Sequence, residues 1–337
     1  MKVLITGATG FLGRKVSALF AHSYKGEVRC LVRPGTDLKG LREACGDEFD
    51  KLHLVTGTLL SQTDCNSIVE GVDLVVHLAS GTSGAPAEHF LNSSVATRNL
   101  LNAMSVTKPK LIHCSSFSVY GCVSLPKGTL INEEIGLESH PELRDIYAQS
   151  KIHQEKVVFE MCQRLEIEFA CIRPGVIYGP GGGAISSRVG LKMFGRFLHL
   201  GRNTTIPITY VENCANVFLV LAKKGVYGGN VYNVVDNDLI TSKKFLRLYS
   251  DNVEKLRSIH IPYTLLLAMS LACEKYHKYS GGQLPDIFTR YKTKSMWKGF
   301  RYTNEKIKAL GWSQIIPTSE GLRKHFDFLR EGNLGKR

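Results

Sequence analysis

Tyr147 and Lys151 are the residues of this sequence whose types and spacing most directly suggest chemistry. They stand four positions apart in DIYAQSKIHQEK, residues Asp145–Lys156, and positions four apart on a helix share one face. A free phenol has a pKa of roughly 10, and a neighbouring ammonium favours the phenolate and lowers that pKa. Such a pair can give a proton to an oxygen that gains negative charge during hydride transfer. The same spacing also fits a solvated helix, and the charged remainder, Gln154–Lys156, is interpreted as plain surface.

Three glycines follow the first apolar run of the chain. Gly7, Gly10 and Gly13 lie in TGATGFLGRKV, between a strand-like and a helix-like stretch. Glycines let the backbone turn tightly and let a pyrophosphate approach, and the free amides of the helix N-terminus then hold its charge. A glycine triplet alone is weak evidence, but a strand before it and a helix after it are the context that a dinucleotide site requires.

Arg33 stands at the end of the second expected strand, in RCLVRPG. An acidic residue at this place would bind the ribose hydroxyls of NAD. A guanidinium instead pairs with a 2′-phosphate and offers no acceptor to a free hydroxyl. The sequence therefore favours NADP as the cofactor, with NAD less favoured.

Short apolar runs alternate with helical stretches in the first half of the chain, which is typical of a parallel sheet covered on both faces. Strands are expected at Lys2–Gly7, Glu27–Arg33, Leu52–Gly57, Leu74–Ala79, Lys110–Ser116, Phe169–Gly175 and Asn230–Asp236. Helices are expected at Leu12–His22, Thr63–Glu70, Glu88–Ser105, Tyr147–Glu166 and Tyr210–Lys224.

The predicted fold is α/β, a Rossmann-type doubly wound parallel sheet with a smaller C-terminal substrate-binding region. We assign residues 1–175 to an NADP-binding Rossmann domain, with a return segment at about 208–225. Residues 176–207 and 226–337 form the substrate-binding region, where the regular alternation is lost.

Composition restricts the class of protein. Apolar residues make up 43% and charged residues 22% of the 337, as in a globular protein. Nine cysteines without a C-x-x-C pair indicate buried reduced thiols in a cytoplasmic protein, and no metal site is expected. The net charge of +13 indicates an acidic partner or only solubility. Nucleic acid is not an expected partner, because motifs of interleaved basic and aromatic residues are absent.

The most apolar later run is YTLLLAMSLAC, Tyr263–Cys273. It is shorter than the roughly 20 residues that span a bilayer. We expect a helix packed in the core; a helix that rests on a membrane surface is the alternative.

Five stretches occur in a characteristic order: TGATGFLG, VVHLAS, HCSSFSVYG, YAQSK and RPGVIYGPGGG. Together they resemble the extended short-chain dehydrogenases/reductases, the NAD(P)-dependent epimerase/dehydratase superfamily. The resemblance implies that Ser116, Tyr147 and Lys151 are catalytic. It also implies that Ala79 and Ser80 line the adenosine side and that Pro174 and Val176 lie near the nicotinamide. The full set expected to bind the cofactor is Gly7, Thr9, Gly10, Phe11, Leu12, Gly13, Arg33, Thr58, Leu59, Ala79, Ser80, Tyr147, Lys151, Pro174 and Val176.

The chain departs from the family pattern at two places. Thr58 stands where the family usually has an acidic residue that contacts the adenine. Ser93 replaces an asparagine that touches the cofactor, with Asn92 as a displaced neighbour. Neither change removes a catalytic residue.

Three functions remain open. RPGVIYGPGG and the tail IPYTLLLAMSLACEKYHKYSGGQLPDIFTR resemble the hydroxysteroid dehydrogenase and dihydroflavonol reductase branches. This favours an NADP-dependent oxidoreductase acting on a hydroxyl or ketone of a bulky alicyclic or sugar-like substrate, anionic or apolar. A nucleotide-sugar 4-epimerase is the alternative, supported by the acid-free basic stretch Arg173–Arg202. A non-catalytic NADP-binding sensor is the second alternative. The resemblance also suggests a homodimer through Glu88–Ser105 and Tyr147–Glu166.

Overall fold

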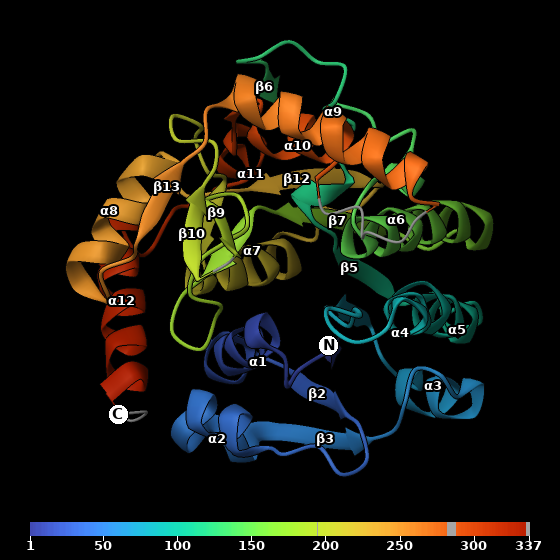
Figure 1. Cartoon of the computed structure of the whole chain (residues 1–337). Coiled ribbons are helices and arrows are strands. Elements are labelled where there is room, and N and C mark those ends of the chain that lie inside the picture. The colour runs from blue at the N-terminus through green and yellow to red at the C-terminus, as the bar shows by residue number, and fades with distance from the viewer. Residues whose placement is uncertain (194, 282–287, 335–337) are drawn as a thin grey trace.

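A seven-stranded sheet forms the centre of the computed structural model, which describes residues 1–193, 195–281 and 288–334. Its strands all pair in parallel, in the order β12-β7-β5-β4-β1-β2-β3 (Figure 1). They are β1 (Lys2–Thr6), β2 (Glu27–Val32), β3 (Leu52–Thr56), β4 (Leu74–His77), β5 (Lys110–Cys114), β7 (Phe169–Pro174) and β12 (Asn230–Val234). Each begins at the residue that the sequence predicts and ends one or two residues earlier.

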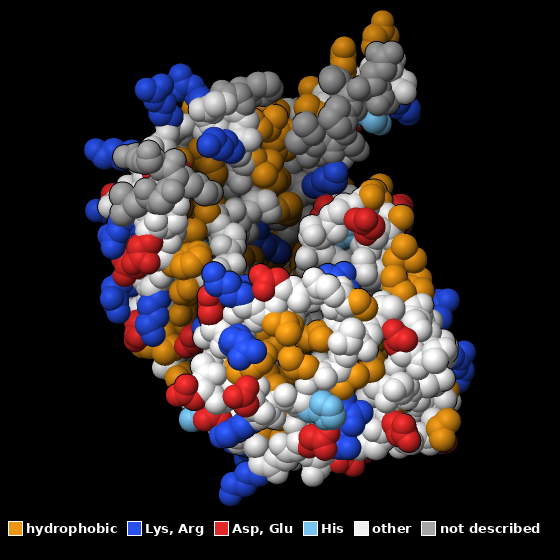
Figure 2. Space-filling view, turned by 90° about the horizontal axis from the view of Figure 1, so that it is seen from below, with side chains coloured by type: hydrophobic (Ala, Val, Ile, Leu, Met, Phe, Trp, Pro, Cys, Tyr) orange, Lys and Arg blue, Asp and Glu red, His pale blue; other side chains and the backbone are white. Residues whose placement is uncertain are grey.

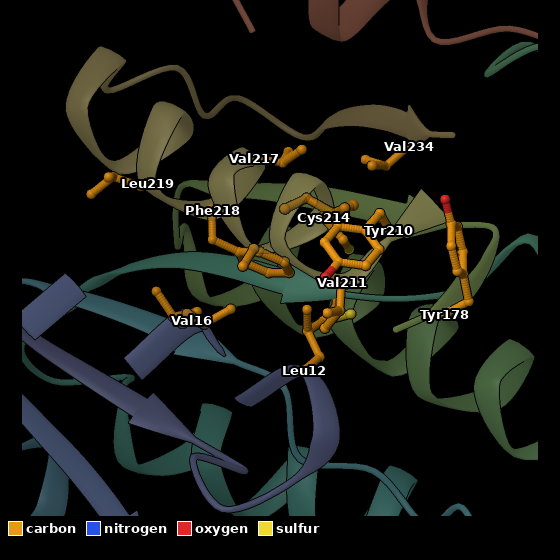
Figure 3. Close-up of a cluster of buried hydrophobic side chains, with 14 of the residues drawn as sticks. Leu12, Val16, Tyr178, Tyr210, Val211, Cys214, Val217, Phe218, Leu219 and Val234 are labelled. Carbon is orange, nitrogen blue, oxygen red and sulfur yellow. The ribbon is translucent and has the colours of Figure 1, made fainter. Parts of the chain in front are cut away.

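Helices cover both faces of the sheet, because alternate residues of a strand point to opposite sides. Val3 and Ile5 of β1 belong to one core cluster, whereas Leu4 belongs to the other. In the first cluster, Val16 of α1 lies against Phe218 of α7 (Figure 3). The first face carries α1 (Phe11–Ser23), α2 (Lys39–Cys45) and α7 (Val211–Lys224), and the second carries α3 (Gln62–Val69), α5 (Ala96–Ala103) and α6 (Ile146–Leu165). The predicted Rossmann-type doubly wound α/β fold is confirmed.

The remaining elements form the smaller region and the connections. The strands are β6 (Leu130–Ile131), β8 (Val176–Tyr178), β9 (Gly190–Met193), β10 (Arg196–His199), β11 (Ile208–Tyr210), β13 (Ser258–His260) and β14 (Arg301–Tyr302). The helices are α4 (Pro86–Phe90), α8 (Ser242–Asn252), α9 (Tyr263–Tyr279), α10 (Arg290–Trp297), α11 (Glu305–Ala309) and α12 (Thr318–Leu334), with short 3₁₀ helices at Gly46–Lys51, Phe117–Val119 and Pro141–Leu143.

One domain boundary needs correction. The assignment of all of 226–337 to the substrate-binding region is wrong for β12, which pairs with β7 in the large sheet. The pairing buries the last three residues of β12, and this burial places the strand in the Rossmann core. Residues 282–287 and 335–337 of the assigned range lie outside the described residues.

The helix predicted at Glu88–Ser105 is interrupted. It consists of α4, a π-helical turn at Leu91–Val95 and α5. Turns of this kind are often found near functional sites, and this one directs Ser93 inward, where it is fully buried.

Helix α9 is largely exposed, so the prediction that it packs in the core is wrong. Of its residues only Leu266 and Ser270 are buried, whereas Leu265 is 51% exposed and Met269 is 36% exposed. The helix lies at the edge of the molecule, where α10 packs against one side of it (Figure 1). For the same reason Cys273 is exposed, while the other eight cysteines are buried free thiols as predicted.

The surface gives two further observations. No helix within the described ranges has the length and apolar character needed to cross a membrane. On the face seen in Figure 2, Lys and Arg side chains are spread among Asp and Glu, and the surface is hollowed near its centre.

Gly13 allows the closest backbone approach in the glycine loop. A Cβ built on Gly13 would lie 1.9 Å from the carbonyl oxygen of Gly7. We predict that Gly13→Ala lowers the free energy of unfolding by about 1–3 kcal/mol, because the clash outweighs the gain in helix propensity of about 1 kcal/mol. The same change should weaken NADPH binding. Chemical denaturation and fluorescence titration measure both effects. Gly183→Ala is the control, because its Cβ would meet no atom within 4 Å; equal effects of the two changes would refute the steric argument.

Candidate active site

A cleft of about 1190 Å³ opens where the parallel strands end. The segments that follow β1, β2, β3, β4, β5 and β7 all contribute to it, and loops and helices of the smaller region line its other side. Ligands of open parallel sheets bind at this edge, beside the strands where the order reverses, here β1 and β4. All fifteen residues expected to bind the cofactor line this one cleft, and so does Ser116. Their individual roles stay predictions.

The glycine loop has the shape that a pyrophosphate needs. Gly10 precedes the first turn of α1, and its amide donates to the carbonyl oxygen of Gly7 at 3.0 Å. Gly7 has a φ of 72°, and a Cβ on it would lie 2.8 Å from the amide nitrogen of Ala79. Only glycine therefore fits there, and the first turn of α1 carries no acidic residue that would repel a phosphate. The residues present fit a dinucleotide.

Arg33 is exposed at the rim of the cleft, directly after β2. Arg29 on the same strand pairs with Glu27 at 3.6 Å, but Arg33 has no carboxylate within 4.0 Å among the described residues. Its guanidinium is thus available to an anionic group at the ribose end of the cleft. Its role in binding NADP stays a prediction.

Helix α6 carries Tyr147 and Lys151 because its start is fixed by a capping residue. Asp145 accepts a hydrogen bond from the amide of Ala148 at 3.0 Å, which satisfies one of the free amides of the first turn. The sequence predicts this helix at Tyr147–Glu166, one residue from its observed ends. The cap places Tyr147 in the first turn, where it faces the end of β5.

Ser116 and Tyr147 both line the cleft, and the Ser116 side chain acts on the phenol of Tyr147. Burial raises the pKa of Tyr147 to about 12, and Ser116 moves it in the opposite direction. From the sequence we expect Lys151 to lower this pKa, so the direction differs, because the loss of hydration outweighs the other contributions. Ser116 also accepts from the amide of Ser118 at 3.1 Å and so caps the short helix that follows it.

Lys151 belongs to a buried hydrogen-bond network. Its ammonium donates to the carbonyl oxygen of Cys114 at 2.7 Å and to the amide oxygen of Gln154 at 2.7 Å. Gln154 in turn donates to the carbonyl oxygen of Ala79 at 3.0 Å and to Thr97 at 2.9 Å. Burial lowers the pKa of Lys151. The interpretation of Gln154 as surface is wrong, because this side chain is fully buried and joins the lysine to the end of β4.

The interpretation of Glu155 as a surface residue is also wrong, because its side chain is fully buried. It forms an ion pair with Arg173 of β7, with Arg173 Nε 3.2 Å from Glu155 Oε2. Burial alone would lower the pKa of Arg173, but the hydrogen bond and the charge of Glu155 raise it instead. Ser115, beside Ser116, donates to the same carboxylate. The pair therefore fixes the end of β5 against α6.

Two histidines lie behind Lys151. The ring nitrogens of His77 contact the hydroxyls of Thr6 at 2.7 Å and Thr97 at 2.8 Å. Burial lowers the pKa of His77 to about 3 and lowers that of His113 well below its ordinary value. Both rings therefore stay neutral at pH 7.

The two departures from the family pattern have local substitutes. Thr58 donates its amide to the carboxylate of Asp64 at 2.8 Å, so an acidic side chain supports this loop from α3. Ser93 accepts from the amide of Gly81 at 3.0 Å and lies 3.2 Å from the hydroxyl of Ser80. Ser93 thus holds the loop after β4, and Asn92 lines the cleft.

The sequence motifs do not include a set of residues that lines the cleft on the side of the smaller region. They share no motif and come from distant segments: Phe117, Arg144, Ile177, Arg188, Leu191, Pro207, Lys292, Met296 and Trp297. The basic stretch Arg173–Arg202 was the one signal in the sequence that includes Arg188. Only the fold brings these segments together.

Residues 3–234 match the family described as NAD dependent epimerase/dehydratase. The chain belongs to this family. It is therefore an NAD(P)-dependent enzyme of the extended short-chain dehydrogenase/reductase superfamily, as the sequence motifs predict.

Three members of the superfamily illustrate the likeness. A sterol-4-alpha-carboxylate 3-dehydrogenase, decarboxylating, from Candida albicans is 24% identical, over 98% of this chain and 97% of its own length. A 2-alkyl-3-oxoalkanoate reductase from Shewanella oneidensis is 24% identical, over 95% of this chain and 84% of its own. The crystal structure of UDP-glucuronic acid 4-epimerase from Bacillus cereus in complex with NAD is 18% identical, covers 98% of this chain and 99% of its own, and has a TM-score of 0.72. At that identity it shows the fold alone.

The raised pKa of Tyr147 gives a prediction about pH. Below pH 12 the phenol is protonated, so it is ready to act as an acid, whereas oxidation of an alcohol needs the phenolate. We expect kcat/KM for oxidation to rise with pH by about tenfold per unit through the neutral range, and reduction to stay nearly flat. Tyr147→Phe should lower kcat in both directions by about 10²–10⁴ and leave NADPH binding intact. Steady-state rates across pH and a fluorescence titration test this; full activity of the variant would remove Tyr147 from the mechanism.

Proposed function

We propose that the chain is an NADP-dependent oxidoreductase that interconverts a hydroxyl and a ketone with Tyr147 as the general acid and base. The observation that carries this proposal is that Ser116, Tyr147 and Lys151 line the same cleft as the glycine loop. A bound nicotinamide cofactor supplies or accepts the hydride. The protein's own side chains donate and accept the proton.

In the reducing direction the substrate oxygen lies between the hydroxyls of Ser116 and Tyr147. As negative charge develops on this oxygen, Tyr147 Oη gives it a proton and Ser116 Oγ donates a hydrogen bond to it. Lys151 would stabilise the phenolate that remains and would hold the ribose hydroxyls of a bound cofactor. The oxidising direction reverses these steps, with Tyr147 as the base.

The substrate end of the cleft supports a bulky and largely apolar substrate. Leu191, Met296 and Trp297 line it together with Phe117. A sterol carboxylate and a branched oxoalkanoate appear in the names of the two relatives, and both have a largely apolar carbon skeleton with a reacting carbon–oxygen group. The second region of the chain thus suits an alicyclic or branched carbon skeleton.

The nucleotide-sugar epimerase is the second candidate, and one observation speaks against it. It needs several cations around a diphosphate, for which the basic stretch Arg173–Arg202 was the sequence argument. Among the described cations of that stretch, Arg188 is the one that lines the cleft. Arg173 is paired with Glu155, and the other three cations are exposed and do not line the cleft. The non-catalytic sensor is the third candidate, and the complete set Ser116, Tyr147 and Lys151 argues against it.

Arg33 makes the NADP preference testable. We expect Arg33→Asp to weaken NADPH binding by about tenfold to a hundredfold and to strengthen NADH binding, because a carboxylate repels the 2′-phosphate and accepts from the ribose hydroxyls. Fluorescence titration with both cofactors gives the ratio. Arg247→Asp on α8 is the charge-matched control, since Arg247 is exposed and does not line the cleft. An unchanged NADPH/NADH ratio in the Arg33 variant contradicts the assignment.

The exposed side of α9 supports a peripheral contact with an anionic membrane surface. Leu265, Met269, Tyr276 and Tyr279 repeat at helical spacing and are 36–89% exposed. Lys275 and Lys278 are exposed on the same helix, and its one carboxylate, Glu274, is paired with Arg290 at 2.7 Å. Each lysine near an anionic surface contributes about 1 kcal/mol.

Sedimentation with vesicles tests this contact. We expect the chain to bind vesicles that contain phosphatidylserine, less at high salt, and the double change Leu265→Glu and Met269→Glu to abolish binding. Val106→Glu is the control, because Val106 is an 87% exposed apolar residue elsewhere. A wild-type chain that stays in the supernatant at low salt excludes the membrane contact.

The expected homodimer and the cytoplasmic location stay predictions. Leu91 and Val95, 43% and 38% exposed, are apolar residues on the first of the two segments proposed for dimer contact. That segment is interrupted by the π-helical turn, so the contact surface would be shorter than a continuous helix offers.

A further inference from the structure

Arg188 lies on the catalytic side of the cleft. It belongs to the loop between β8 and β9 and lines the cleft with Ser186 and Leu191. Its guanidinium is 3.5 Å from the hydroxyl of Tyr302. The ring of Tyr302 stacks on that of Phe117 with centroids 5.7 Å apart, and Phe117 follows Ser116 directly. Arg188 is therefore connected through Tyr302 and Phe117 to the segment of Ser116, and both Arg188 and Ser116 line the cleft.

Arg188 differs from the other arginines around the catalytic residues in having no carboxylate partner. Arg144 is paired with Glu138 at 3.3 Å, and Arg173 is paired with Glu155. No carboxylate of the described residues lies within 4.0 Å of Arg188. A half-buried guanidinium is stabilised when an anion replaces the water it has lost. The unpaired charge points to an anionic group on the ligand.

The surroundings of Arg188 restrict the kind of anion. Leu191, Met296 and Trp297 make the adjoining wall apolar. Cys122 is close enough for the charge of Arg188 to act on it, although burial still raises the pKa of this thiol to about 11. Arg144 and Lys292 also line the cleft, and Arg144 is paired with Glu138. A guanidinium such as Arg188 beside an apolar wall suits a carboxylate on a carbon skeleton.

We propose that Arg188 binds a carboxylate that stands on the carbon next to the reacting carbon, so that the substrate is a β-hydroxy acid or its β-oxo acid. This proposal rests on the proposed oxidoreductase function. In oxidation the hydride leaves the carbinol carbon for NADP⁺, the hydroxyl proton goes to Tyr147, and the carboxylate is unchanged. The names of the two curated relatives describe the same arrangement, a carboxylate one carbon away from the carbon that is oxidised or reduced.

Three matched probes test the proposal. They are a decalin that carries a hydroxyl and a carboxylate on neighbouring carbons, its methyl ester, and the plain decalinol. Binding is measured by calorimetry to the NADP⁺-loaded Tyr147→Phe chain, so that turnover does not interfere, and oxidation is measured on the chain with Tyr147 intact. We expect the acid to bind about tenfold to a hundredfold more tightly than the ester, the range that a charged hydrogen bond supplies.

The variants separate a role in recognition from a role in folding. Arg188→Gln should remove the preference for the acid and leave the affinity for ester and decalinol unchanged, which shows that the cleft is still formed. Arg188→Lys should keep part of the preference, because it keeps the charge but loses the two-pronged geometry. Arg202→Gln is the matched control: Arg202 belongs to the same basic stretch, is exposed and does not line the cleft.

The outcomes distinguish the two proposals. If acid and ester bind equally to the wild-type background, or if Arg188→Gln weakens both alike, the carboxylate role of Arg188 is wrong while the oxidoreductase proposal stands. If no probe is oxidised by the chain with Tyr147 intact, the oxidoreductase proposal loses its support. The calorimetric preference of the acid, and its loss in Arg188→Gln, then still decides whether the cleft has a carboxylate site.

Discussion

The buried ion pair between Glu155 and Arg173 is the interaction on which the active site depends. It joins the helix that carries Tyr147 and Lys151 to strand β7, and its carboxylate also accepts from Ser115 at the end of β5. Removing one partner of such a pair leaves an uncompensated buried charge and costs about 3–5 kcal/mol. Because Ser115 is next to Ser116 and α6 carries Tyr147, the pair holds together the two segments that carry the hydroxyls proposed for catalysis.

The distribution of positive charge follows from the same principle. Buried guanidiniums that serve the framework, Arg173 and Arg144, each have a carboxylate partner, and the buried ammonium of Lys151 is held by a carbonyl and an amide oxygen. Of the described arginines that line the cleft, Arg33 and Arg188 have no carboxylate partner. The paired arginines thus stabilise the fold, and the unpaired guanidiniums that line the cleft are available to anionic groups of a ligand.

Much of this arrangement could be predicted because it is encoded locally. All seven strands begin at the predicted residue, and the glycine loop, Ser116, Tyr147 and Lys151 lie in one cleft. The misses concern burial. Glu155 and Gln154 look like surface residues of a polar helix, and Tyr263–Cys273 looks like a core helix, yet the first two are fully buried and much of the third is exposed.

The sequence by itself determined the sheet, the cofactor loop and the catalytic set, since strand and helix periods and glycine positions are properties of neighbouring residues. Tertiary structure alone decided which polar residues are buried and what surrounds the substrate. Met296 and Trp297 lie more than 100 positions after Arg188 and Tyr147 in the sequence, and nothing in the local pattern indicates that they line the same cleft. The physical reason is that burial depends on which surfaces pack together, and partners for Glu155 or Arg188 are supplied, or withheld, by segments distant in the chain.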